Sequence, residues 1–409
     1  MKGAAAWLLL SLAWLRPAAA ERVTCTSNWY VSYGGTHDFE LLRVDPKGLP
    51  LSSLRFDRGY HDPAETSHGF LDFDGDGLSD VFATELTPSG FHEWYYSSGG
   101  TGDWTDLGLR TTPPSEVRFG DFDGDAKTDV FFTTPRDDGA LQWLYSPGGT
   151  SNGVELAYAF TPLADLRFGD FDGNGKTDVF TIQPLLTGGY AWLISYGGNS
   201  DYVQVNSAST ELADMLFADV DGGGTDVITT VYDQAEGYLW YASSSATGAY
   251  RALGSNGLLR LEEVVGFGNF DANPRTSEVL TESQFGGFGT WITWSFPGVN
   301  PVASSLPLYD YIPVDQLRLA DFDGDGQTDV FMMTRTCPEP DGPFAGAAAG
   351  CALALLRRRS RPLRRGWPRR VAAWQTSVWG VGREIRCGES RASSAAHGAR
   401  GSVRRGWLR

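Results

Sequence analysis

Short aspartate-rich loops recur along this chain, with oxygen-bearing side chains at fixed alternating positions. In Asp72-Phe-Asp-Gly-Asp-Gly-Leu-Ser-Asp80 the carboxylates occupy positions 1, 3, 5 and 9, and the glycine at position 6 permits a sharp turn. Calcium takes roughly six to eight hard oxygen ligands in a forgiving geometry, and this alternation supplies them together with the backbone carbonyl at position 7. Magnesium demands a stricter octahedron, and zinc prefers histidine or cysteine, which these loops lack. The pattern therefore predicts calcium-binding loops rather than ordinary Asp-Gly hairpin turns, which need only one or two such residues.

Four copies of the loop keep the full ligand pattern, and two are degraded. The Asp219 loop is one residue short, and the loop that begins at Asn269 contains Pro274 and is expected to be empty. In the second copy Ala126 replaces the glycine at position 6, so we expect a left-handed alanine there. The sequence predicts about four to five calcium ions. The expected ligands are Asp72, Asp74, Asp76, Leu78 and Asp80; Asp121, Asp123, Asp125, Lys127 and Asp129; Asp170, Asp172, Asn174, Lys176 and Asp178; Asp321, Asp323, Asp325, Gln327 and Asp329; and, more weakly, Asp219, Asp221 and Asp226.

The loops belong to a repeating unit with a period of 49 to 52 residues. A second motif, Trp-x-x-Ser-x-Gly-Gly, alternates with them from Trp29 onward, and short runs rich in aromatic and β-branched residues flank both motifs. The chain starts with a tryptophan half-unit and ends its repeats with a loop half-unit at Asp321. We therefore predict an all-β fold, a β-propeller of about six four-stranded blades, with seven as the alternative. N-terminal strands should complete the last blade and close the ring.

The segment Phe119-Gly-Asp-Phe-Asp-Gly-Asp-Ala-Lys-Thr-Asp-Val-Phe131 resembles the FG-GAP/VCBS repeat, which is found in integrin α-chain propellers and in many exported bacterial proteins. The resemblance extends over residues 29–333. It implies calcium in the blade hairpins and an adhesion or ligand-binding role, without specifying the ligand. Integrin-type propellers usually have seven blades, whereas six loops are found here.

The repeat also predicts a disulfide between Cys25 and Cys337. Counting from the nearest motif, Cys337 corresponds to Asp137 and Cys25 to Gly139 of the second repeat, two residues apart in one hairpin loop. In the closing blade that hairpin is cut, so the cysteines should occupy its two ends. We expect their Cα atoms to lie about 5–7 Å apart, within disulfide range.

The two ends of the chain differ in composition from the repeats. Residues 1–20 read as a secretory signal peptide, which predicts a secreted or cell-surface protein with its cysteines in an oxidising compartment. Residues 21–336 form the propeller, 337–359 resemble a PEP-CTERM-type sorting or anchor segment, and 360–409 read as a disordered or aberrant basic tail. The net charge is −30 over residues 1–356 and +13 beyond them. An acidic body argues against nucleic acid as a partner.

No nucleophile elbow, zinc-protease helix or phosphate-binding glycine loop is found in the sequence, so we expect no enzyme. The repeated tryptophans either pack in the core or stack on sugar rings, and Tyr60, His61, His68 and His92 near the inserted segment 57–69 either bind metal or are ordinary loop residues. The expected function is a monomeric, calcium-binding adhesion or ligand-binding module for an extracellular protein or glycan, with a possible C-terminal membrane or sorting interaction. The alternative is a sugar-specific propeller lectin, and a less favoured one is an accessory domain of an exported enzyme system.

Overall fold

The computed structural model describes residues 25–36, 38–56, 71–255, 264–271, 278–283, 290–295, 302–306 and 316–337. The chain divides into two compact units, 1–341 and 342–409, and every described residue belongs to the first. The predicted signal peptide, the insertion 57–69, and the tail beyond Cys337 lie outside the described residues. Within the described part, no helix is long and apolar enough to cross a membrane.

The strands form antiparallel sheets of four, as expected for propeller blades, and six such sheets are present in the described part. Each consists of four consecutive strands except the last, which combines the two ends of the repeats. The sheets are β3 (Leu54–Arg55), β4 (Val81–Leu86), β5 (His92–Ser97) and β6 (Trp104–Arg110); β7 (Val117–Gly120), β8 (Asp129–Pro135), β9 (Leu141–Ser146) and β10 (Val154–Ala159); β11 (Arg167–Gly169), β12 (Asp178–Pro184), β13 (Tyr190–Ser195) and β14 (Val203–Ala208); β15 (Leu216–Ala218), β16 (Asp226–Asp233), β17 (Gly237–Ser243) and β18 (Arg251–Ser255); β19 (Val264–Gly268), β20 (Glu278–Ser283), β21 (Thr290–Ser295) and β22 (Val302–Leu306); and β2 (Glu40–Asp45), β1 (Thr26–Ser32), β24 (Asp329–Thr336) and β23 (Leu317–Ala320).

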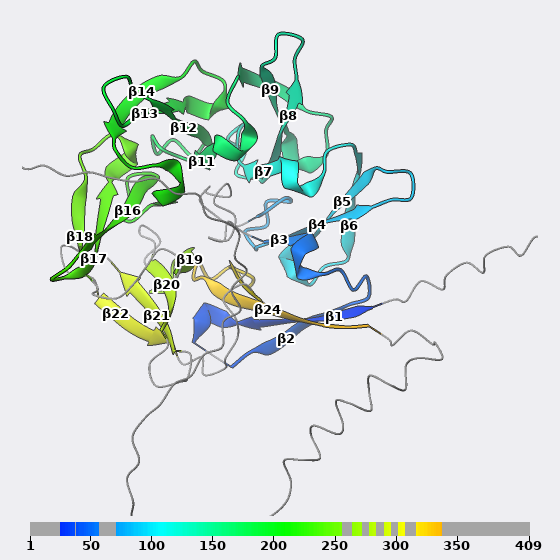
Figure 1. The fold of residues 1–409 in the computed structure, drawn as a ribbon. Coiled ribbons are helices and arrows are strands. Elements are labelled where there is room, and N and C mark those ends of the chain that lie inside the picture. The colour runs from blue at the N-terminus through cyan, green and yellow to red at the C-terminus, as the bar shows by residue number, and fades with distance from the viewer. Residues whose placement is uncertain are drawn as a thin grey trace, which may run out of the picture. The chain divides into compact units, whose positions relative to one another are not determined.

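The last of these sheets joins the two ends of the repeat region. β1 pairs with β24 from Thr26↔Thr336 to Ser32↔Val330, and the two strands lie side by side in Figure 1. The predicted all-β propeller with four-stranded antiparallel blades is confirmed, and N-terminal strands complete the last blade as expected. Five of the sheets carry an aspartate-rich loop between their first two strands, and the β19–β22 sheet carries the degenerate Asn269 version.

The tryptophans of the second motif lie in the hydrophobic core. Trp29, Trp94, Trp143, Trp192 and Trp240 are at most 1% exposed, and phenylalanines of the neighbouring strands pack edge-on against several of them. A strand between two neighbouring blades must bury both faces, which explains its apolar residues. Core packing is therefore confirmed for these five tryptophans, and they are closed to sugar stacking. Trp291 has no described side chain.

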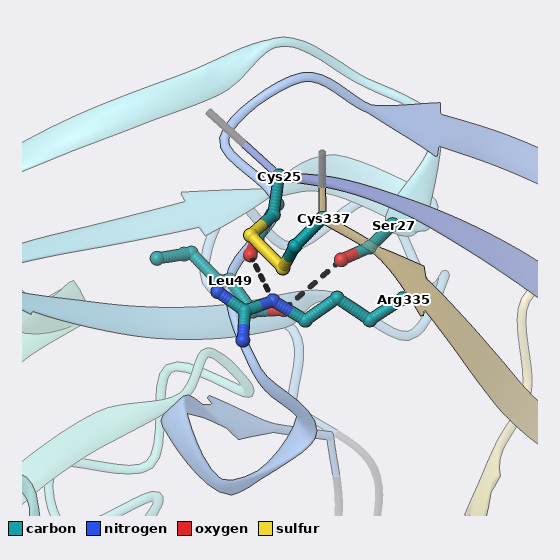
Figure 2. The surroundings of a disulfide bond; sticks show 6 residues. Cys25, Ser27, Leu49, Arg335 and Cys337 are labelled. Carbon is teal, nitrogen blue, oxygen red and sulfur yellow. Dashed lines mark hydrogen bonds between the residues drawn. A yellow bond between two sulfur atoms is a disulfide. The ribbon is translucent and has the colours of Figure 1, made fainter. Parts of the chain in front are cut away.

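The predicted Cys25–Cys337 disulfide is present, with a Cα–Cα distance of 4.1 Å (Figure 2). The expected separation of about 5–7 Å was wrong. It assumed that the cysteines lie in a hairpin loop, whereas the pairing of β1 with β24 continues in register up to them. Thr26 faces Thr336, so the cysteines are the next directly opposed pair of two straight strands. The turn after β2 packs onto this end of the blade, where Arg335 Nε donates to Gly48 O at 2.7 Å and Ser27 Oγ donates to Leu49 O at 3.1 Å.

Successive blades are joined by hydrogen bonds between their aspartate loops. The serine or threonine at position 8 donates its amide to the carbonyl of position 1 in the preceding blade, at 2.6–2.7 Å. In four of these junctions its hydroxyl also accepts the position-1 amide, at 2.6–2.8 Å. The pairs are Ser79–Asp321, Thr128–Asp72, Thr177–Asp121, Thr225–Asp170 and Thr328–Asn269. The loops are therefore part of the contact between blades, and the remaining junction falls on residues 272–277, outside the described part.

Candidate metal centres

Each aspartate loop is folded by its own side chains. The carboxylate at position 1 accepts the amides that follow it. In the first loop Asp72 accepts the amides of Gly75, Asp76 and Gly77 at 2.6–3.2 Å. Positive φ angles of +80° and +84° at Gly75 and Gly77 curl the backbone around this carboxylate. Ala126 takes position 6 of the second loop at φ +67°, so the predicted left-handed alanine is confirmed.

The aspartate at position 9 has a role that the ligand pattern did not predict. It is fully buried, and it connects the loop to the glycine turn after the tryptophan strand. In the third blade Asp178 accepts the amide of Phe171 at 2.9 Å with one oxygen and the amide of Gly197 at 2.7 Å with the other. The constant interval of 19 residues between the position-9 aspartate and this turn was the available signal. In the closing blade the same bond joins Asp329 to Gly34 across the two ends of the repeats, at 2.8 Å.

Burial raises the pKa of all five position-9 carboxyls to about 7. Hydrogen bonds from two backbone amides lower this pKa, and the other aspartates of the same loop raise it by a smaller amount. The group consists of Asp80, Asp129, Asp178, Asp226 and Asp329. An ionised carboxylate at this position is costly unless a cation accompanies it. The electrostatics of the loop therefore favour a bound cation at neutral pH.

The loops bring three carboxylates close enough to share one ion. In each of five groups, one oxygen from each residue lies within 4.8 Å of the others. Positions 1, 3 and 9 converge in four groups, and positions 1, 3 and 5 in the last. The groups are Asp72, Asp74 and Asp80; Asp121, Asp123 and Asp129; Asp170, Asp172 and Asp178; Asp219, Asp221 and Asp226; and Asp321, Asp323 and Asp325. Hard oxygens at such distances fit calcium, and four of the loops also keep the position-5 oxygen.

Position 5 of the first loop is turned toward other partners. Asp76 accepts the amide of Leu78 at 2.9 Å with one oxygen and the hydroxyl of Ser98 at 3.1 Å with the other. Asp125, Asn174 and Asp325 accept the position-7 amide in the same way. These side chains order the loop, and the structure does not bring Asp76 or Asp125 into the converging group.

The lysines at position 7 of the second and third loops contact the preceding loop, whereas Gln327 of the closing blade donates to Asp325 of its own loop at 2.9 Å. Lys127 Nζ donates to the carbonyl of Asp74 in the preceding blade, and Lys176 Nζ donates to that of Asp123, both at 2.8 Å. Each lysine thus places a positive charge between two acidic loops. For Lys127 and Lys176, only the backbone carbonyl remains a candidate ligand.

The fourth loop contains its own cation. Asp221 at position 3 forms an ion pair with Arg251, at 3.0 Å, and accepts the hydroxyl of Ser244. Arg251 faces Ala242 in the β17–β18 ladder, and the equivalent residues of the two preceding blades are Val203 and Val154. The arginine is thus found next to the loop that has lost a residue. Its guanidinium neutralises charge where the shortened loop offers fewer ligands, so this loop fits calcium poorly.

The Asn269 position also departs from a ligand arrangement. Its side-chain amide donates to the carbonyl of Gly326 in the next loop. The remainder of this loop, residues 272–277, lies outside the described part, as do Tyr60, His61 and His68. His92 begins β5.

Position-1 variants should separate calcium-binding loops from the fourth loop. Asp121→Asn and Asp170→Asn keep an oxygen that can accept the loop amides but remove a charged ligand, so each should lower the number of bound calcium ions by one. Asp219→Asn is the matched control and should leave that number unchanged, because Arg251 already neutralises its loop. Equilibrium dialysis followed by elemental analysis measures the ions per chain. A loss with Asp219→Asn would show that the fourth loop does bind calcium.

The sequence comparison identifies the repeat. Residues 72–132 and 121–181 each match the model of the FG-GAP-like repeat. Among curated proteins there is no match.

Solved structures give weak similarities. TolB from Acinetobacter baumannii is 11% identical with a TM-score of 0.38, and the match covers 70% of this chain and 64% of that one. The endo-arabinase from Bacteroides thetaiotaomicron is 14% identical with a TM-score of 0.28, over 64% of this chain and 97% of that one. The chain therefore spans less than two thirds of the TolB length, and similarity at this level carries no argument about activity.

Proposed function

We propose that this protein, a β-propeller with FG-GAP-like repeats, is an exported, non-catalytic, calcium-binding module that binds an extracellular protein or glycan. The observation that carries the proposal is the convergence of three carboxylates in each loop, at the contact between blades. A calcium ion in such a loop would neutralise the carboxylates and cross-link backbone positions that also hold the neighbouring blade. The ions would then make the ring rigid enough to present its connecting loops to a ligand.

We further propose that the six sheets form one closed ring. Two bonds between distant segments support it: Asp329 accepts the amide of Gly34, and Ser79 donates its amide to Asp321 O at 2.7 Å. A closed ring leaves only one short outer strand per blade as a sheet edge, which suits a monomeric exported protein.

Export rests on two features of the chain. Residues 1–20 have the pattern of a signal peptide. The Cys25–Cys337 disulfide requires an oxidising compartment to persist. The sorting-type segment 337–359 would add retention at the cell surface.

The test is binding by the purified calcium-loaded protein to extracellular matrix proteins and to a glycan array, with and without chelator. We expect calcium-dependent capture of at least one ligand and no turnover on a panel of glycosidase, esterase and peptidase substrates. Turnover that survives repurification would contradict the non-catalytic assignment, and the absence of any ligand would contradict the binding role.

Stability should depend on pH in opposite ways with and without calcium. Because burial raises the pKa of the position-9 carboxyls to about 7, the ion-free folded protein binds more protons than the unfolded chain between about pH 4 and 7. Its stability should therefore fall as pH rises through this window. Calcium-loaded protein should instead weaken as pH falls, because protons compete with the ion.

Thermal melts from pH 5 to 8 in chelator and in calcium measure both trends. Asp178→Asn removes one of the five raised carboxyls and should reduce the dependence in chelator in proportion, whereas the exposed Asp201→Asn should leave it unchanged. A melting temperature in chelator that falls on acidification from pH 8 to 5 would contradict the prediction.

A further inference from the structure

A cavity of about 840 Å³ lies along the junction between blade β7–β10 and blade β11–β14. Its walls come from the end of β10 and the linker after it, the later part of β12, the start of β13 and the linker after β14. The aspartate loop of this blade precedes β12, whereas the cavity includes Thr181–Pro184 at the other end of that strand. The cavity is thus separate from the metal centres, and its size is within the range of small-molecule sites.

Two exposed aromatic side chains mark one wall of the cavity. Tyr158 is 56% exposed and Phe160 is 72% exposed. Ala159 faces Leu141 in its blade as Ala208 faces Tyr190 in the next, so the equivalents of Tyr158 and Phe160 in that blade are Ser207 and Ser209. The repeat therefore builds the same strand end from serines, and the fold does not require the aromatic rings. Arg136 lies over the Tyr158 ring, 4.3 Å from its centroid, so Tyr158 already has a cation–π partner. Phe160 is the more exposed of the two rings, and it is the one that indicates a binding surface.

The accessible polar groups of the cavity are acidic or neutral. Asp165, Gln183 and Glu211 line it, and Tyr190 donates its hydroxyl to Glu211 at 3.4 Å. The one basic residue of the lining, Arg167, is 4% exposed, and its guanidinium donates to the carbonyls of Ala164 and Leu166. Its positive charge thus faces these buried carbonyls rather than the open part of the cavity. The cavity would repel phosphates, acidic sugars and nucleic acid.

Aromatic faces beside carboxylate and amide acceptors fit one ligand chemistry well. A sugar presents a C–H face that packs on an aromatic ring and a rim of hydroxyls that donate to carboxylates and amides. We propose that this cavity binds a short neutral oligosaccharide, with Phe160 stacking on a sugar ring and Asp165 and Glu211 accepting its hydroxyls. This inference rests on the proposed ligand-binding function and names the ligand class for one site.

The test uses the calcium-loaded protein on an array of neutral oligosaccharides, followed by calorimetric titration of the array oligosaccharide that binds most strongly. Phe160→Ser, which installs the residue of the next repeat, should weaken binding about tenfold, because it removes the aromatic face on which the sugar ring would pack. Tyr232→Ser is the matched control, since Tyr232 is 63% exposed on β16 and lies outside the cavity lining. Both variants should keep the wild-type melting temperature and calcium content.

Four results would overturn the inference. Glycan binding that Phe160→Ser leaves unchanged would place the sugar elsewhere and leave the proposed function intact. Capture of choline, but of no neutral glycan, in a manner that depends on Phe160 would assign the cavity to a cationic ligand. Capture of an extracellular protein without any glycan would refute this site alone, whereas the absence of every ligand would refute the proposed function as well.

Discussion

Replacing both Cys25 and Cys337 with serine should lower the free energy of unfolding by about 5 kcal/mol. The bond encloses a sequence separation of 312 residues, and in the chain-entropy account a loop of this size restricts the unfolded chain strongly. It also fixes the end of the β1–β24 ladder, on which the contact between the N-terminal and C-terminal strands depends. Chemical denaturation in calcium, monitored by tryptophan fluorescence, measures the loss.

A control for this experiment is the reduced wild-type protein, which should have the stability of the double variant. Ser27→Ala removes a nearby hydrogen bond to Leu49 without opening the loop, and it should cost only about 1 kcal/mol. Equal stability of wild type and double variant would contradict the role of the disulfide in closing the ring.

Removing calcium should have the second large effect, because it acts on every intact loop at once. A ligand at about 100 times its dissociation constant stabilises the folded state by about 2.7 kcal/mol per site. Four such sites would together contribute on the order of 10 kcal/mol. For a domain of this size we expect the melting temperature to fall by roughly 10 °C or more in excess chelator. Calcium should restore it, and magnesium at the same concentration should restore it only in part.

Several features of the fold and the site follow from the spacing of residues alone. Alternating aspartates predicted the converging carboxylates, and the half-units at Trp29 and Asp321 predicted the strands that complete the last blade. The same arithmetic placed Cys25 opposite Cys337. These inferences succeeded because all repeats share one backbone geometry. The place of a residue in one blade can therefore be read from the equivalent residue of another blade.

Features that depend on two blades or on one altered copy were not predictable in this way. The bond from Lys127 to Asp74 joins neighbouring blades, and a single repeat contains no sign of it. The ion pair of Arg251 with Asp221 is a departure from the repeat, and only the strand register shows that the arginine reaches the shortened loop. The cavity beside Phe160 was not predictable either, because residues of two successive blades line it together.

The most direct test of the central claim is the number of calcium ions bound to the wild-type chain. The purified protein would be dialysed to equilibrium against buffered calcium and its ion content measured per chain by elemental analysis. We predict four ions, one each in the loops that begin at Asp72, Asp121, Asp170 and Asp321, and displacement of all four by excess chelator. A chain that retains its fold and binds no calcium would contradict the account.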